Sequence, residues 1–184
     1  MAHETLGTEA DEALYALVGR GRFDAFEALV ARHGQRLLGY CKKMVGDFGE
    51  EISQETWLAL WKAAPNLAEK GPFRPLLYTS ARRRCLNQLR GVRAKETRPI
   101  DVEERDPISS PQLRILLDAQ SDRIVADALA KLSPEKREAI ALRFVDDLSY
   151  EEMAEIVGEN VSTLRSRVHF ALKDLRPIIA RRLG

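Results

Sequence analysis

The side chains with the clearest potential for binding chemistry are basic and hydroxyl groups that gather in two segments. Residues 148–170 read LSYEEMAEIVGENVSTLRSRVHF, and further basic residues follow as far as Arg182. Between Arg82 and Arg98, seven basic residues are opposed by one acid, Glu96. Such groups bind phosphates and base edges, so both segments are candidates for contact with a nucleic acid. The sequence shows no Ser-His-Asp set, paired carboxylates or phosphate-binding loop in a supporting context, so we do not expect an enzyme.

The C-terminal segment has the spacing of two helices joined by a tight turn. Ser149 and Glu152 form an S-x-x-E capping box that would start the first helix. Gly158 then permits a sharp turn, and Asn160 can cap the second helix. The apolar positions expected to be buried are Tyr150, Met153, Ala154 and Val157 on the first helix and Val161, Leu164, Val168, Ala171, Leu172 and Leu175 on the second.

This spacing is typical of a helix-turn-helix, whose second helix enters the major groove of DNA. An ordinary αα-hairpin with a solvated polar face is the alternative. Phe170 could touch a thymine methyl group or pack against the protein. The candidate DNA contacts on the second helix are Ser162, Thr163, Arg165, Ser166, Arg167, His169 and Phe170.

A second cationic helix is expected to begin near Phe73 or Pro75. Its buried positions would be Leu77, Ala81, Cys85, Gln88 or Leu89, and Val92. The opposite face carries Thr79, Arg83, Asn87 and Arg90, and Tyr78 borders it. A cationic face beside an aromatic ring suits an unpaired nucleic-acid strand, because a base can stack on the ring. A simple solvated charged face is the alternative.

The helix expected from Glu50 to Ala64, with Pro65 ending it, has a different character. It displays acidic and amide groups beside Trp57, Leu58 and Trp61. An acidic rim next to large apolar groups suits a protein interface. The alternative is that both tryptophans are buried in the core.

The elements that position these groups all show helical periodicity, and strand signals are weak. Thr8 is expected to cap a short first helix that carries Leu14 and Val18. Asp24 with Glu27 resembles a capping box at the start of a long second helix.

The composition changes over residues 95–112, which hold three prolines and an acidic cluster. Such a segment is typical of a linker. Ser133 and Pro134 open a later helix, because proline suits the first helical position. We therefore predict an all-α protein with two helical domains, residues 1–95 and 115–184, joined by an extended linker over residues 96–114.

The whole chain of 184 residues carries a net charge of only +1, so its basic character is local. Cys41 and Cys85 have no C-x-x-C spacing, and with three scattered histidines they predict neither a metal site nor a cofactor. The acidic, polar start MAHETLGTEADE does not resemble a signal peptide. No apolar run approaches the ~20 residues of a membrane span, so we expect a cytoplasmic protein without membrane insertion.

Three of these segments together resemble the extracytoplasmic-function (ECF) group of bacterial RNA polymerase sigma factors. GDFGEEISQETWLALWKA resembles region 2.2, and GPFRPLLYTSARRRCLNQLRGVRA resembles regions 2.3 and 2.4. LSPEKREAIALRFVDDLSYEEMAEIVGENVSTLRSRVHFALKDLR resembles region 4. The resemblance covers about Phe23 to Leu175, and the linker is least alike. The family's usual tryptophan near Pro75 and Leu76 is missing, and Phe170 stands where many relatives have a basic residue.

The resemblance implies a protein that binds core RNA polymerase, directs it to a promoter and opens the DNA. Region 2.2 would contact the polymerase clamp through Glu50, Glu51, Gln54, Glu55 and Leu58. Regions 2.3 and 2.4 would hold the unpaired −10 strand through Tyr78, Arg83, Asn87 and Arg90, with a pocket for a flipped base supplied by residues 66–71. Region 4 would place its recognition helix, with Ser162, Thr163, Arg165, Ser166 and Arg167 at its front, in the −35 major groove. Family members are commonly held inactive by an anti-sigma factor, so such a partner is implied as well.

Two other functions fit part of the sequence. A transcription regulator could use the helix-turn-helix without engaging polymerase, and the DFGEEISQETW segment together with the second cationic helix argues against it. A decoy could bind an anti-sigma protein without contacting DNA, and the intact row of Arg165, Ser166 and Arg167 argues against that function.

Overall fold

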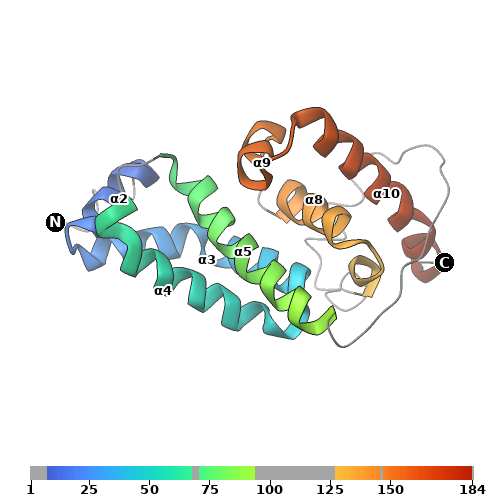
Figure 1. Cartoon of the computed structure of the whole chain (residues 1–184), viewed down its shortest axis with the longest axis horizontal. Coiled ribbons are helices and arrows are strands. Elements are labelled where there is room, and N and C mark those ends of the chain that lie inside the picture. Colours follow the sequence, from blue (N-terminus) through green and yellow to red (C-terminus); the bar gives the residue numbers. More distant parts are fainter. Residues whose placement is uncertain (1–7, 68–70, 94–126, 146, 184) are drawn as a thin grey trace. The chain divides into compact units, whose positions relative to one another are not determined.

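The computed structural model describes residues 8–67, 71–93, 127–145 and 147–183, and every regular element in these ranges is a helix (Figure 1). The chain divides into two compact units, residues 1–89 and 90–184. The all-α prediction with two helical domains is therefore confirmed. The predicted linker over residues 96–114 lies outside the described residues. None of the described helices is both long and apolar enough to cross a membrane.

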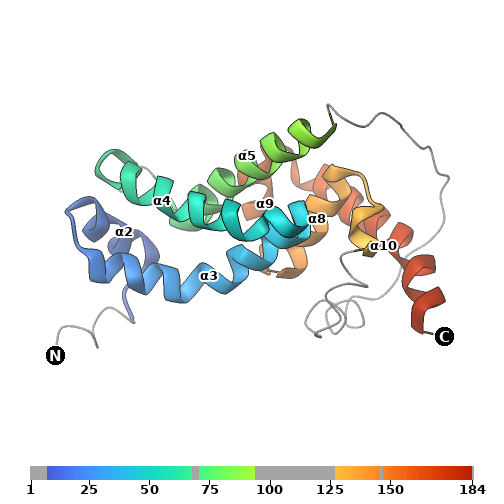
Figure 2. The ribbon, with the colours of Figure 1, turned by 90° about the horizontal axis from the view of Figure 1, so that it is seen from below.

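The first unit is built from helices that pack around a shared apolar core (Figure 2). Its fully buried side chains include Leu14, Leu29, Leu37, Met44 and Leu77. The elements are α2 (Asp11–Gly19), α3 (Phe23–Val45), the short 3-10 helix η1 (Gly46–Phe48), α4 (Gly49–Leu67) and α5 (Phe73–Arg93).

The corner between α3 and α4 depends on a glycine. A Cβ atom added at Gly49 would lie 2.5 Å from the backbone nitrogen of Lys42 and 2.6 Å from its Cα. Both are backbone atoms that cannot move aside, so only glycine fits this position. The close approach brings the start of α4 against the end of α3, and α4 then packs along α3.

Polar contacts attach α2 to the other helices of this unit. The Tyr15 hydroxyl donates to the Leu60 carbonyl at 2.9 Å, and burial raises the pKa of Tyr15 to about 12. Glu12 Oε1 accepts the backbone N–H of Phe73 at 3.0 Å, which places a carboxylate at the N-terminus of α5. His33 is buried and its Nε2 lies 2.7 Å from Asp11 Oδ2. These contacts connect α2 with α3, α4 and α5.

Three predicted helix boundaries in this unit are wrong. Ala10, not Thr8, occupies the N-cap position of α2. Helix α3 begins at Phe23, so Asp24 lies inside its first turn and accepts from Arg22 Nε at 2.8 Å instead of forming a capping box with Glu27. This hydrogen bond from Arg22 lowers the pKa of Asp24 to about 2.

The third error concerns Pro65, which lies inside α4 and does not end it. A proline removes one backbone donor. The helix continues only to Leu67, so the missing hydrogen bond falls in its last turn, where the loss costs little.

The second unit contains α8 (Pro134–Val145), α9 (Tyr150–Val157) and α10 (Val161–Leu183). Ser133 Oγ accepts the N–H of Lys136 at 3.4 Å, so the predicted start of α8 at Ser133 and Pro134 is confirmed. Helix α10 packs on both α8 and α9. The buried side chains of the three helices include Ile140, Leu142, Met153, Ile156, Leu164, Val168 and Leu175.

Candidate nucleic-acid interface

The predicted helix-turn-helix is present in the second unit, formed by α9 and α10. Ser149 Oγ accepts the N–H of Glu152 at 3.1 Å, and Glu152 Oε2 accepts the N–H of Ser149 at 2.8 Å, which completes the capping box. Gly158 ends α9 in the left-handed region with φ 77°. Asn160 Oδ1 accepts the N–H of Thr163 at 2.8 Å and so caps α10.

The side chains that α9 buries differ from those predicted from its apolar spacing. Met153 and Ile156 are buried, whereas Tyr150, Ala154 and Val157 are only partly buried. Tyr150 lies at the edge of the unit because two guanidinium groups pack on its ring. Arg143 is 5.4 Å and Arg165 is 5.3 Å from the ring centroid. The prediction of Tyr150 as a core residue was therefore wrong, and its ring positions Arg165 instead.

The front of α10 is open to solvent. Ser162, Arg165 and Ser166 are exposed, and Thr163 is half-buried. The hydroxyl of Ser162 donates to Asn160 Oδ1 at 2.7 Å, so its oxygen is left to accept a hydrogen bond. This surface offers a cation and hydroxyl groups at the N-terminal end of a helix, where backbone N–H groups favour anions.

Arg167 lies on the same helix but is already paired. Its Nη2 is 2.6 Å from Oε2 of Glu159, in the turn between the two helices. The arginine side chain is only 18% exposed. Glu159 was not identified as a functional residue from the sequence, because a turn residue eight positions from an arginine gives no periodic signal.

His169 and Phe170 are half-buried farther along α10. Their rings meet edge to face with centroids 5.4 Å apart. The ammonium group of Lys173 lies 6.0 Å from the Phe170 ring centroid. Phe170 therefore packs against its neighbours and still presents part of its ring to solvent.

A second candidate surface runs along α5. Thr79, Arg83, Asn87 and Arg90 are all exposed, as the helical wheel predicted, and we call them the cationic ridge. Tyr78 does not border this ridge. It is fully buried with 0% exposure, and its ring packs edge to face on Tyr40 with centroids 5.4 Å apart.

The prediction that Tyr78 is available for stacking on a base is thus not supported by its position in this fold. Tyr78 follows Leu77 directly and both side chains are fully buried, so the covered face of α5 is wide enough to include two neighbouring positions. A wheel drawn from one helix cannot show how wide that covered face is.

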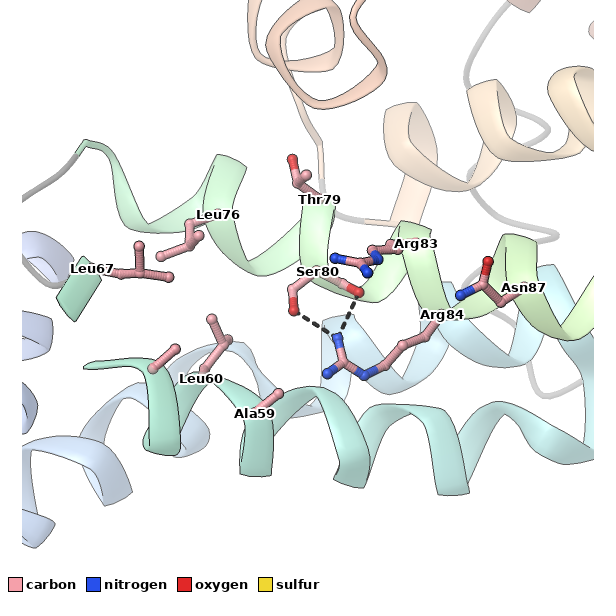
Figure 3. Close-up of a pocket in the computed structure, with 10 residues that line it drawn as sticks. Ala59, Leu60, Leu67, Leu76, Thr79, Ser80, Arg83, Arg84 and Asn87 are labelled. Atoms are coloured by element: carbon pink, nitrogen blue, oxygen red, sulfur yellow. Dashed lines mark hydrogen bonds between the residues drawn. The ribbon is translucent and has the colours of Figure 1, made fainter. Parts of the chain in front are cut away.

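A pocket of about 470 Å³ lies between α4 and α5, directly beside the cationic ridge (Figure 3). One wall is polar and includes Ser80, Arg83 and Arg84. Arg84 Nη1 donates to the Ser80 carbonyl at 3.0 Å and to its hydroxyl at 2.8 Å, so its guanidinium lies between the two helices. The whole lining consists of Ala59, Leu60, Ala63, Leu67, Leu76, Thr79, Ser80, Arg83, Arg84 and Asn87.

The family resemblance implied a pocket supplied by the loop over residues 66–71. Within that loop, residues 68–70 lie outside the described residues, and Leu67 lines the pocket. Ala59 and Ala63 were overlooked because alanine carries no polar signal. Their small side chains on one face of α4, four residues apart, leave room against α5.

The predicted protein-binding face of α4 is exposed. Glu50, Glu51, Gln54 and Glu55 all face solvent, and Leu58 is 53% exposed. An exposed leucine on an acidic helix face suits a partner with a basic rim and an apolar centre.

The two tryptophans of α4 divide between core and surface. Trp57 is buried and Trp61 is half-buried, and both pack edge to face on Phe26, with centroids 5.7 Å and 5.1 Å away. The alternative that the tryptophans belong to the core is therefore correct for Trp57. Among the described residues, no three His, Cys, Asp or Glu side chains gather in a way that could hold a metal ion.

Comparison with known proteins places this two-unit helical fold in a class of transcription factors. Residues 29–95 match the family model described as Sigma-70 region 2, and residues 122–175 match the one described as Sigma-70, region 4. RNA polymerase sigma factor CarQ of Myxococcus xanthus is 30% identical over 167 residues, which cover 86% of this chain and 91% of CarQ.

The ECF RNA polymerase sigma factor SigK of Mycobacterium ulcerans (strain Agy99) is also 30% identical, over 89% of this chain and 90% of SigK. Among solved structures, CnrH in complex with the cytosolic domain of CnrY has a TM-score of 0.70 at 26% identity and covers 94% of this chain and 99% of CnrH. The chain belongs to the ECF group of RNA polymerase sigma factors. By family it is a promoter-specific initiation factor and not an enzyme.

Proposed function

We propose that this chain binds core RNA polymerase, reads −35 DNA with α10 and captures an unpaired −10 strand on α5. The observation that carries the proposal is the cationic ridge with a pocket of about 470 Å³ beside it. A bare basic surface would suit any polyanion. A pocket next to phosphate-binding groups suits one strand whose base has left the stack.

The −10 step follows from the chemistry of the pocket. Arg83 and Asn87 belong to the cationic ridge and also line the pocket. From this position they can bind a phosphate and hydrogen-bond to the edge of a flipped base. The apolar floor formed by Leu60 and Leu76 offers contact for the face of that base. Unstacking a base costs a few kcal/mol, and these contacts offset that cost.

The −35 step uses the exposed start of α10. Arg165 and the hydroxyls of Ser162 and Ser166 are presented to solvent on a capped helix that projects from a compact unit. Side chains in this position reach base edges and phosphates when the helix lies in the major groove.

The polymerase would bind the exposed acidic face of α4 through Glu50, Glu51, Gln54, Glu55 and Leu58. We also propose a regulatory partner, an anti-sigma protein, because the structurally similar sigma factor RpoE of Bartonella quintana was solved in complex with the anti-sigma factor NepR. A protein with these partners acts in the cytoplasm, where polymerase and promoter DNA are found.

The test separates promoter opening from polymerase binding. We expect the double reversal Arg83→Glu and Arg90→Glu to reduce open-complex formation by at least about tenfold, or about 1.4 kcal/mol, because two strand-binding cations become anions beside the pocket. Opening would be followed by the fluorescence of 2-aminopurine in the −10 region, and polymerase binding by co-purification with core enzyme.

The matched control reverses the charge of two exposed lysines away from the ridge, Lys42→Glu and Lys131→Glu, and so changes the net charge by the same amount. The control is expected to open promoters like the wild type. If the Arg83 and Arg90 reversals weaken polymerase binding as much as opening, or leave opening intact, the −10 assignment is wrong.

A further inference from the structure

A carboxylate pairs with one partly buried arginine of the proposed recognition helix. Arg167 belongs to α10, and helical side chains lean toward the helix N-terminus, so its guanidinium reaches back to the turn. There Glu159 Oε2 accepts from Nη2 at 2.6 Å. The two side chains are 18% and 36% exposed, so both stay near water.

Arg165 shows the contrast on the same helix. It is exposed, and its guanidinium packs on the ring of Tyr150, which holds the group without neutralising its charge. Arg167 instead meets an anion whose oxygens have the geometry and charge that a DNA phosphate would offer. A phosphate that binds Arg167 through Nη2 therefore competes with Glu159.

We infer that Glu159 is a specificity-determining residue that withholds Arg167 from the DNA backbone. This inference rests on the proposed −35 function of α10. Every DNA sequence offers the same phosphate backbone. Each arginine or lysine that is kept from the phosphates therefore lowers the affinity of the protein for DNA of any sequence. An ion pair whose two side chains both reach solvent is weak, so a well-fitted site can still exchange Glu159 for DNA, whereas a random duplex gains too little from the exchange.

The experiment measures binding of the full chain to a pool of random-sequence 30-base-pair duplexes by fluorescence anisotropy over a range of KCl concentrations. We expect Glu159→Gln to bind about two- to fivefold tighter than the wild type, the range of a released surface ion pair. The log–log salt dependence should also steepen by about 0.9, the value for one added phosphate contact.

Two further variants isolate the pair. Glu155→Gln removes one exposed acid from α9 and matches the charge change, and it should leave the salt slope at the wild-type value. In the Arg167→Ala background, Glu159→Gln should change neither the DNA affinity nor the salt slope, because the carboxylate then has no guanidinium to release.

Three results would overturn the inference. They are an unchanged slope in Glu159→Gln, an equal gain from Glu155→Gln, or a gain that persists without Arg167. Failure of the proposed function itself would look different, since wild type and all variants would then lack binding to the duplexes.

Discussion

At the scale of single residues, the candidate DNA-binding arginines are held by neighbours that the sequence pattern could not reveal. Arg165 and Arg143 share the ring of Tyr150, and Arg167 pairs with Glu159. The positions of the arginines were predictable from helical spacing. Their partners were not, because a ring on one helix and an arginine on another come together only through the fold.

Arg165 should contribute one cation to −35 binding. We expect Arg165→Ala to weaken binding of a −35 duplex taken from an activated promoter and to lower the salt slope by about 0.9. Tyr150→Phe keeps the aromatic face and should bind like the wild type, whereas Tyr150→Ala should lose part of the affinity. An Arg165→Ala variant with the wild-type salt slope would remove Arg165 from the phosphate contacts.

Tyr15 should give the first unit a pH dependence at alkaline pH. Burial raises its pKa from 10.0 to about 12, so the protonated hydroxyl is favoured in the folded state. The stabilisation is complete below pH 10 and is lost as the pH rises from 10 to about 12, by on the order of 2 kcal/mol.

Urea unfolding of wild type and Tyr15→Phe at pH 8 and pH 11 tests this behaviour. The wild type should lose more free energy of unfolding between the two pH values than Tyr15→Phe does. Tyr150→Phe, at a partly exposed tyrosine, serves as the control and should follow the wild type. Parallel losses in wild type and Tyr15→Phe would show that Tyr15 titrates normally.

At the scale of helices, sequence patterns predicted which segments are helical and which face of α5 is polar. The capping box at Ser149 and the turn at Gly158 were predicted because each depends on local geometry alone. The start of α3 and the continuation of α4 past Pro65 were missed. Both depend on small energies that tertiary packing overrides.

The same limit explains the error at Tyr78. A single helix shows period and polarity, but the width of its buried face is set by how many neighbours cover it. Here Tyr40 of α3 packs on Tyr78 and removes it from the surface. The pocket between α4 and α5 was not predicted from the residues, because part of its lining is small residues that carry no chemical signature.

Gly49 provides a prediction about the corner between α3 and α4. Gly49→Ala would put a Cβ atom 2.5 Å from a backbone nitrogen, so we expect a loss of about 1–3 kcal/mol in unfolding free energy. Gly91→Ala is the matched control, since nothing lies within 4 Å of its added Cβ in α5, and it should be neutral or stabilising. Equal urea midpoints for Gly49→Ala and wild type would contradict the close packing described for this corner.

At the scale of the whole molecule, charge is separated between elements although the net charge is only +1. An acidic face on α4 lies in the same unit as the cationic ridge on α5, and a second basic surface lies on α10. Such separation allows one chain to bind a protein through one face and nucleic acid through others. This segregation could be predicted from sequence, because it follows from which segments carry which charges.

Run-off transcription with purified core RNA polymerase on a genomic promoter library is the most direct test of this account. We predict that adding the wild-type chain gives transcripts that start at a defined subset of promoters and that core polymerase alone does not produce. If core polymerase with the chain gives the same transcripts as core polymerase alone, the proposed function is contradicted.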